Sequence, residues 1–136
     1  MKELKIQAHI DELPQVLAFV DEQLEPLGCS IKTTTQIDVA LEEIFINIVN
    51  YAYAPDTGEA VIRSQISGDP AILTVSFMDS GTPYDPLAKP DPNVSIPLRE
   101  RQKGGLGIFL VKKTMDEMHY EYKEGHNILT LKKKLI

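Results

Sequence analysis

One largely apolar segment carries polar side chains that could hold a ligand together. If residues 33–53 form a helix that turns by about 100° per residue, then Glu43, Asn47 and Asn50 lie within an arc of about 60°. A carboxylate and amides one turn apart can bind a divalent cation, or position a water or hydroxyl group. The same stripe could simply face solvent, although it contains neither Lys nor Arg, the usual solvating residues.

A second group follows residues 72–78, which alternate as a strand. Asp79 at the end of that strand could accept a hydrogen bond from an exocyclic amine such as that of adenine. Gly81, two residues on, lets the backbone approach a flat ligand closely. Taken alone, this Asp-Ser-Gly sequence fits a plain turn equally well.

A third group is a glycine-rich segment, Gly104, Gly105 and Gly107, directly before a predicted helix. Backbone N–H groups and the positive end of a helix can bind phosphate there. The alternative is a simple helix entry beside a solvated basic loop. The segment is neither a Walker A motif nor a Rossmann fingerprint. Three basic residues lie just upstream: Arg99, Arg101 and Lys103.

The elements that must position these groups follow from hydrophobic periodicity. We expect strands at 4–10, 60–67, 72–78, 120–123 and 128–135, and helices at 11–25, 33–53 and 104–118, with Asp11 as the N-cap of the first helix. Five of the nine prolines fall between Pro83 and Pro97, which predicts a loop of about twenty residues, and loops of that length are usually functional or disordered. The order of elements predicts an α+β fold: a two-layer sandwich with helices on one face of a mostly antiparallel, mixed sheet.

Length and charge restrict the class of protein. The 136 residues are enough for a single domain, residues 1–136, with one core. A net charge of -6 disfavours a nucleic-acid partner. The single cysteine, Cys29, excludes an internal disulfide and is typical of a reducing compartment, so we expect a cytoplasmic protein. Neither a signal peptide nor a membrane span of about 20 apolar residues is visible, and no membrane partner is expected.

In their order along the chain, the three groups resemble the N, G1 and G2 boxes of the GHKL ATPase superfamily, whose members share the Bergerat fold. The resemblance is greatest to its small stand-alone branch, the anti-sigma-factor serine/threonine kinases, and extends over residues 4–135. The matching segments are E-x-x-x-N at Glu43 and Asn47, D-x-G-x-P-[FY]-D-P at 79–86, G-G-L-G-I-x-L-V-K at 104–112 and M-D-E at 115–117.

The resemblance implies a role for each matching residue. Glu43 would be the general base that activates an attacking hydroxyl, and Asn47 would ligate Mg²⁺. Asp79 would bind the amino group of adenine, with Gly81 against the ring. The remaining residues implied to bind ATP are Arg101 in a Pro-rich lid, and Gly104, Gly105, Leu106 and Gly107, with Gly105 and Gly107 at the phosphates.

The function implied is that of an ATP-dependent serine/threonine kinase. It would pass the γ-phosphoryl group of ATP to an anti-sigma-factor antagonist protein and bind a sigma factor as an alternative partner. A homodimer is a further expectation. Two alternatives stay open: a non-catalytic ATP-binding module that switches partners, and an ATP hydrolase. Three places depart from the family pattern. Tyr51 stands where many relatives have His or another residue near the phosphates, and Asn50 adds an amide with no assigned role. His126-Asn127 follows Gly125 where larger relatives have a Thr, so His126 also has no assigned role.

Overall fold

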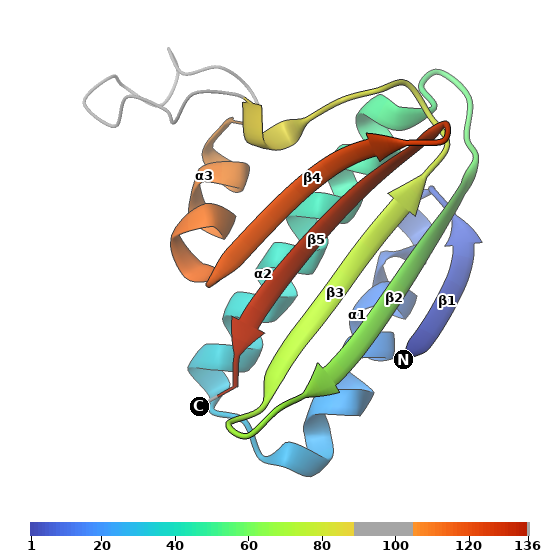
Figure 1. Cartoon of the computed structure of the whole chain (residues 1–136). Helices are drawn as coiled ribbons and strands as arrows, with labels where there is room; N and C mark the ends of the chain where they lie inside the picture. Colours follow the sequence, from blue (N-terminus) through green and yellow to red (C-terminus); the bar gives the residue numbers. More distant parts are fainter. Residues whose placement is uncertain (89–104, 136) are drawn as a thin grey trace.

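Five strands form one sheet in the order β1-β2-β3-β5-β4 (Figure 1). The computed structural model describes residues 1–88 and 105–135. Every strand pairing in this part of the chain is antiparallel, so the sheet is antiparallel throughout rather than mixed. The strands are β1 Lys2–Gln7, β2 Glu59–Ser67, β3 Ile72–Asp79, β4 Glu117–Lys123 and β5 His126–Lys134.

Three helices cover one face of this sheet (Figure 1): α1 Leu13–Leu24, α2 Ile31–Asn47 and α3 Gly105–Thr114. Alternate residues of the strands point to the helices and are buried, for example Val75 and Phe77 of β3. They pack on the apolar face of α2, where Ile37, Leu41 and Phe45 are fully buried. The predicted α+β sandwich with helices on one face is therefore confirmed.

The first two helices begin differently from the prediction. Asp11 is not a helix cap, because residues Ile10–Glu12 form a short 3₁₀ turn in which the Asp11 backbone N–H donates to His9 Nδ1 at 3.1 Å. The next helix starts at Ile31, two residues before the predicted start. The Ser30 hydroxyl accepts a hydrogen bond from Thr33 N–H at 3.1 Å there, which is a standard N-cap.

The predicted helix at 33–53 changes its winding before it ends. α2 stops at Asn47, and the five residues Ile48–Ala52 continue as a π-helical turn. Such turns insert an extra residue into the helical repeat and often occur at functional sites. The side chains that follow Asn47 therefore lie on different faces from those that a regular α-helix would give them.

The last helix is shorter than the predicted 104–118, because α3 ends at Thr114. Pairing with β5 takes over at this point: Asp116 N–H donates to Lys132 O at 2.9 Å, and β4 begins at Glu117. Of the predicted Pro-rich loop, Pro86–Ala88 form a 3₁₀ turn, and residues 89–104 lie outside the described part.

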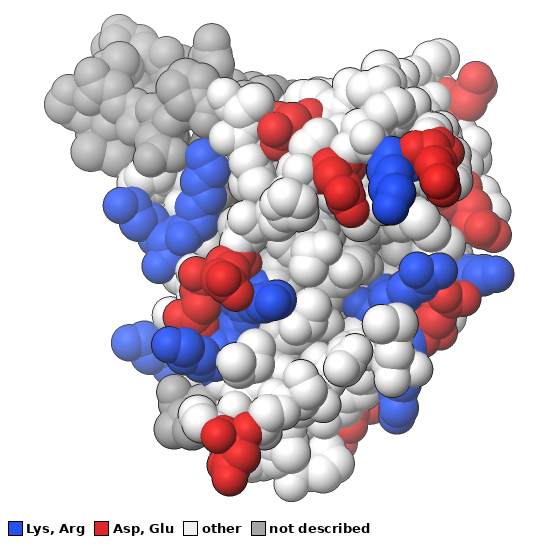
Figure 2. All heavy atoms as spheres, viewed as in Figure 1, with Lys and Arg blue, Asp and Glu red and all other residues white. Residues whose placement is uncertain are grey.

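Within the part of the chain that the structure describes, no helix covers the other face of the sheet. Figure 2 views this face and shows a band of uncharged atoms between charged side chains toward both sides. Uncharged residues of three neighbouring strands contribute to this face, among them Val61, Ser76, Met78 and Ile128. None of the helices in residues 1–88 and 105–135 has the length and apolar character needed to cross a membrane.

Candidate functional site

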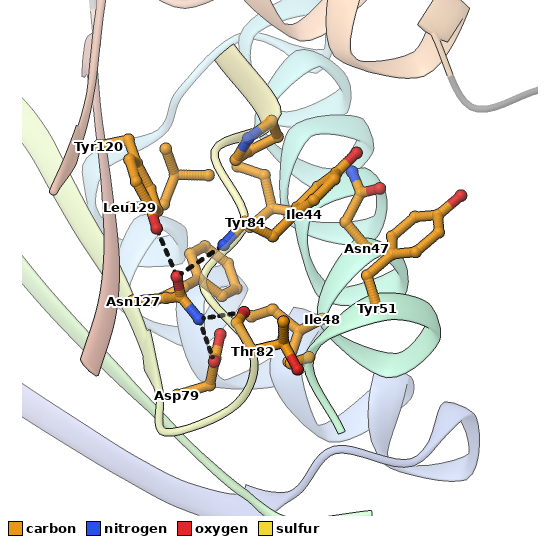
Figure 3. A pocket seen from close by; sticks show the side chains of 13 residues that line it. Ile44, Asn47, Ile48, Tyr51, Asp79, Thr82, Tyr84, Tyr120, Asn127 and Leu129 are labelled. Carbon is orange, nitrogen blue, oxygen red and sulfur yellow. Dashed lines mark hydrogen bonds between the residues drawn. The ribbon is translucent and has the colours of Figure 1, made fainter. Parts of the chain in front are cut away.

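A pocket lies between the C-terminal end of α2 and the adjoining ends of β3 and β5 (Figure 3). Apolar side chains make most of its wall, and a few polar groups converge on it, which is the usual composition of a small-molecule site. The lining residues are Ile44, Asn47, Ile48, Tyr51, Ala52, Phe77, Asp79, Thr82, Tyr84, Pro86, Tyr120, Asn127 and Leu129.

Asp79 and Asn127 form the polar end of the pocket. They are direct cross-strand partners on β3 and β5. Each is 6% exposed and points toward the helices, as do the buried apolar residues Phe77 and Leu129 next to them on the same face. Asn127 Nδ2 donates to Asp79 Oδ1 at 2.8 Å, and Gly81 N–H donates to the same oxygen at 2.9 Å. A buried carboxylate held in this way presents a fixed hydrogen-bond acceptor to a ligand.

Two tyrosines stack on each other at the outer wall. The rings of Tyr51 and Tyr84 are 5.0 Å apart between centroids and inclined by 25°. Tyr51 comes from the π-helical turn, and Tyr84 comes from the loop after β3. The space left inside is about 30 Å³, so a purine base would enter only after these side chains shift outward. Such side-chain changes are common on ligand binding.

The loop after β3 is fastened to the end of the α2 region. Thr82 N–H donates to Ala52 O at 2.8 Å, and a Cβ atom at Gly81 would lie 2.1 Å from that same oxygen. The Tyr53 hydroxyl accepts from Ser80 N–H at 2.7 Å and donates to Glu59 O at 2.6 Å. Only glycine fits at position 81, because any side chain would push this loop off the helix.

Glu43 lies one helical turn before Asn47 and touches the first turn of α3. A Cβ atom on Gly107 would lie 2.0 Å from Glu43 Oε2, so the backbone of α3 packs directly on this carboxylate. Burial raises the pKa of Glu43, and the negative charge of Glu42 raises it further. A half-buried carboxyl with a raised pKa beside a pocket is typical of a general base.

The structure brings some of the predicted residues together. Asn47 and Asp79 line the pocket, and Gly81 borders it through its bond to Asp79. Glu43 and Gly107 contact each other beside the pocket rather than line it. Asn50 is exposed and does not join them, because the π-helical turn shifts its position.

The remaining predicted residues belong to the glycine-rich segment and the lid. Gly105 is the first residue of α3, and Leu106 is the second. Arg101 and Gly104 lie outside the described residues, so their expected contacts with a nucleotide stay predictions.

Sequence reasoning assigned no role to several residues of the pocket. Tyr84 and Tyr120 line it, and Asn127 is its most connected polar side chain. One signal was available for Asn127: it is a polar residue at an inward position of an alternating strand, followed by the buried Leu129 and Leu131. No local pattern indicates that Tyr51 and Tyr84 meet, since they are 33 positions apart in the sequence.

The comparison with known families agrees with this geometry. Residues 6–133 match the model of the histidine kinase-like ATPase domain. The chain belongs to this family. Similar proteins include those named serine-protein kinase RsbW from Bacillus cereus strain Q1, at 26% identity, and from Bacillus anthracis strain CDC 684, at 25%. Each alignment covers 96% of this chain and 82% of the relative.

Solved structures show the same fold. One contains the RsbU and RsbW domains of Rv1364c from Mycobacterium tuberculosis, with a TM-score of 0.66 at 20% identity. The match covers 99% of this chain and 33% of that longer one. Another is the catalytic domain of the histidine kinase ThkA, with a TM-score of 0.52 at 14% identity, covering 99% and 98% of the two chains.

Proposed function

We propose that this histidine kinase-like ATPase domain is a serine/threonine protein kinase, as its relatives' name suggests. The observation that carries the proposal is the packing of the Glu43 carboxylate against the first turn of α3 at Gly107. This packing places a carboxylate that can act as a general base beside the N-terminus of a helix, where the positive end of the helix dipole and the free N–H groups favour phosphate binding. The adenine of ATP would occupy the neighbouring pocket, with its amino group at Asp79.

The reaction balances with these residues. The hydroxyl oxygen of a partner's serine or threonine forms a bond to the γ-phosphorus, while the bond between that phosphorus and the bridging oxygen of ADP breaks. The hydroxyl proton goes to Glu43. Phosphoryl transfer depends mainly on position and charge neutralisation, so the chain itself needs to supply little more than one base and a fixed phosphate site.

A magnesium ion bound with ATP would neutralise charge on the phosphates. The Asn47 side chain offers one amide oxygen in the pocket wall. A single protein ligand of this kind fits Mg²⁺, because the ion keeps several waters and takes most of its other ligands from substrate phosphates. Among the described residues, no three His, Cys, Asp or Glu side chains are placed to form a protein-only metal site.

The acceptor that we propose is an anti-sigma-factor antagonist protein, with a sigma factor as the alternative partner. This part of the proposal rests on the motif resemblance together with the RsbW relatives. A homodimer is a further prediction that sedimentation of the purified chain would test.

The decisive experiment incubates the chain with radiolabelled γ-phosphate ATP, magnesium and a purified antagonist protein at pH 8. We expect label on the antagonist, and a loss of at least about 100-fold with Glu43→Gln. The matched control is Glu42→Gln, an exposed neighbour on the same helix, which should transfer at nearly the wild-type rate.

Other outcomes identify the alternatives. Release of free phosphate without a labelled protein would indicate an ATP hydrolase. ATP binding with neither product would indicate a non-catalytic switching module. Transfer that Glu43→Gln leaves unchanged would contradict the assigned base.

A further inference from the structure

The buried amide of Asn127 has no ligand-binding capacity left, although it lies in the wall of the pocket. We propose that Asn127 is a positioning residue that sets the base specificity of the site by fixing the Asp79 carboxylate. The inference rests on the proposed function, because it takes ATP as the ligand of the pocket.

The hydrogen bonds of Asn127 account for the whole side-chain amide. Nδ2 donates to Asp79 Oδ1 at 2.8 Å and to Thr82 O at 3.0 Å (Figure 3). Oδ1 accepts from Tyr84 N–H at 3.1 Å and from the Tyr120 hydroxyl. An amide side chain has two N–H donors and an oxygen with two lone pairs. All four are used within the protein, so Asn127 acts on a ligand only through its neighbours.

Chemistry allows this amide one orientation. The carboxylate oxygen and the Thr82 carbonyl accept hydrogen bonds, whereas Tyr84 N–H only donates. A flipped amide would place its NH₂ group against the N–H of Tyr84 and its oxygen against two other oxygens. With 6% of its surface exposed, Asn127 could not replace these lost bonds with water.

The consequence falls on Asp79. Its Oδ1 receives two donors, Asn127 Nδ2 and Gly81 N–H, which fixes the plane of the carboxyl group. Oδ2 is the oxygen that these bonds leave for a ligand. A fixed acceptor favours a purine with an amino group at that place and disfavours one with a carbonyl oxygen, because two acceptors would then face each other.

The same amide also ties three elements to that carboxylate. It joins the end of β3 to the loop at Thr82 and Tyr84, and through Tyr120 to β4. Replacing it would free both Asp79 and the loop that closes the pocket. Replacing Asn127 should therefore weaken binding of the adenine amino group more than binding of the phosphates. None of the four hydrogen bonds of Asn127 involves a residue assigned to the phosphates.

The test measures the dissociation constants of ATP and inosine triphosphate by calorimetry, with magnesium, for wild type and variants. Inosine triphosphate differs from ATP in having an oxygen in place of the 6-amino group. We expect wild type to prefer ATP by tens-fold or more. Asn127→Ala should reduce that ratio by about tenfold, and Asn127→Thr, whose hydroxyl can still donate to Asp79, should restore part of it.

A matched control separates position from general stability. Ser64→Ala removes another buried polar group, 1% exposed, which hydrogen-bonds Gln23 away from the pocket. It should lower the melting temperature but leave the ATP-to-inosine ratio unchanged. If neither Asn127 variant folds, Tyr120→Phe removes one of the four bonds and should reduce the ratio by a smaller factor.

The outcomes are distinguishable. An unchanged ratio in folded variants, an equal change in Ser64→Ala, or a wild type that binds both nucleotides equally would overturn the role of Asn127. A wild type that binds neither nucleotide would instead overturn the proposed function.

Discussion

Because Gly107 has no side chain, its backbone can contact Glu43, which lies 64 positions earlier in the sequence and belongs to another motif. The carboxylate of Glu43 occupies the space that a Cβ atom would need, 2.0 Å from Oε2. The glycine is therefore required by a contact with the proposed base, in addition to any contact with phosphate. Spacing within either motif does not reveal this pairing.

Gly107→Ala should reduce phosphoryl transfer by at least about tenfold, because the methyl group displaces Glu43 or the first turn of α3. Alanine is the better helix former, so the fold should survive. Transfer to the antagonist and the melting temperature measure the two effects. Leu110→Ala, an exposed position of the same helix, is the control and should change transfer little. Wild-type transfer by Gly107→Ala would contradict the contact.

The raised pKa of Glu43 gives a prediction for pH. A base works only when deprotonated, so burial, which raises this pKa, moves the acid limb of the rate profile to higher pH. Glu42→Gln removes the second cause and should move that limb back toward lower pH, with rates converging above the limb. Profiles of kcat against pH for the two proteins provide the measurement. A shift to higher pH, or none, would show that Glu42 does not act on the base.

Among the elements, the contact between α1 and α2 contains a carboxyl pair. Burial raises the pKa of Asp38 to about 7, and a hydrogen bond with Asp21 raises it as well. Oδ1 of each residue is buried and has no partner within the described part of the chain. The folded protein therefore binds a proton that the unfolded chain releases near its ordinary pKa of 3.8. Stability should fall as pH rises from about 4 to about 7.

Asp38→Asn should stabilise the protein at pH 8 by about 1 kcal/mol, a value discounted for solvent screening of a half-buried pair. The gain should vanish only near about pH 2 to 3, below the ordinary pKa of 3.8, where the wild-type carboxyl is protonated in both states. Urea unfolding at both pH values measures it. Glu22→Gln, on the exposed side of α1, should show no such pH dependence. A stabilisation that is equal at both pH values would contradict the shared proton.

The elements also show where sequence patterns are sufficient. Alternation located both hairpins, because strands with one buried face repeat every two residues. The π-helical turn at Ile48–Ala52 left no such mark, since its apolar residues fit a regular helix as well. It removed Asn50 from the predicted polar face and placed Tyr51 in the pocket. The end of α3 was also missed, because pairing of Asp116 with Lys132 decides it.

For the molecule as a whole, the ordered motifs predicted the fold, and they predicted Asn47 and Asp79 in one pocket. They did not predict the closing network, which depends on pairs that are distant in the sequence, such as Asn127 with Asp79. The register between neighbouring strands decides which residues form such pairs, and the motifs of a single sequence do not specify that register.

Magnesium ATP should stabilise the whole fold if the pocket binds it. At a concentration 100 times the dissociation constant, linkage adds about 2.7 kcal/mol to the free energy of unfolding. Asp79→Asn should lose most of the resulting rise in melting temperature, because its amide presents a donor to the amino group of adenine. Thermal unfolding with and without nucleotide measures this. An equal rise in Asp79→Asn would contradict the base site.

The strand order has a consequence for folding kinetics. β5 pairs directly with the central strand β3, although α3 and β4 lie between these two strands in the sequence. Contacts between such distant segments cost loop-closure entropy and form late. The pocket, whose walls come from α2, β3 and β5, is therefore complete only after this pairing. Nucleotide should slow unfolding and leave the folding rate nearly unchanged, since the transition state lacks its binding site.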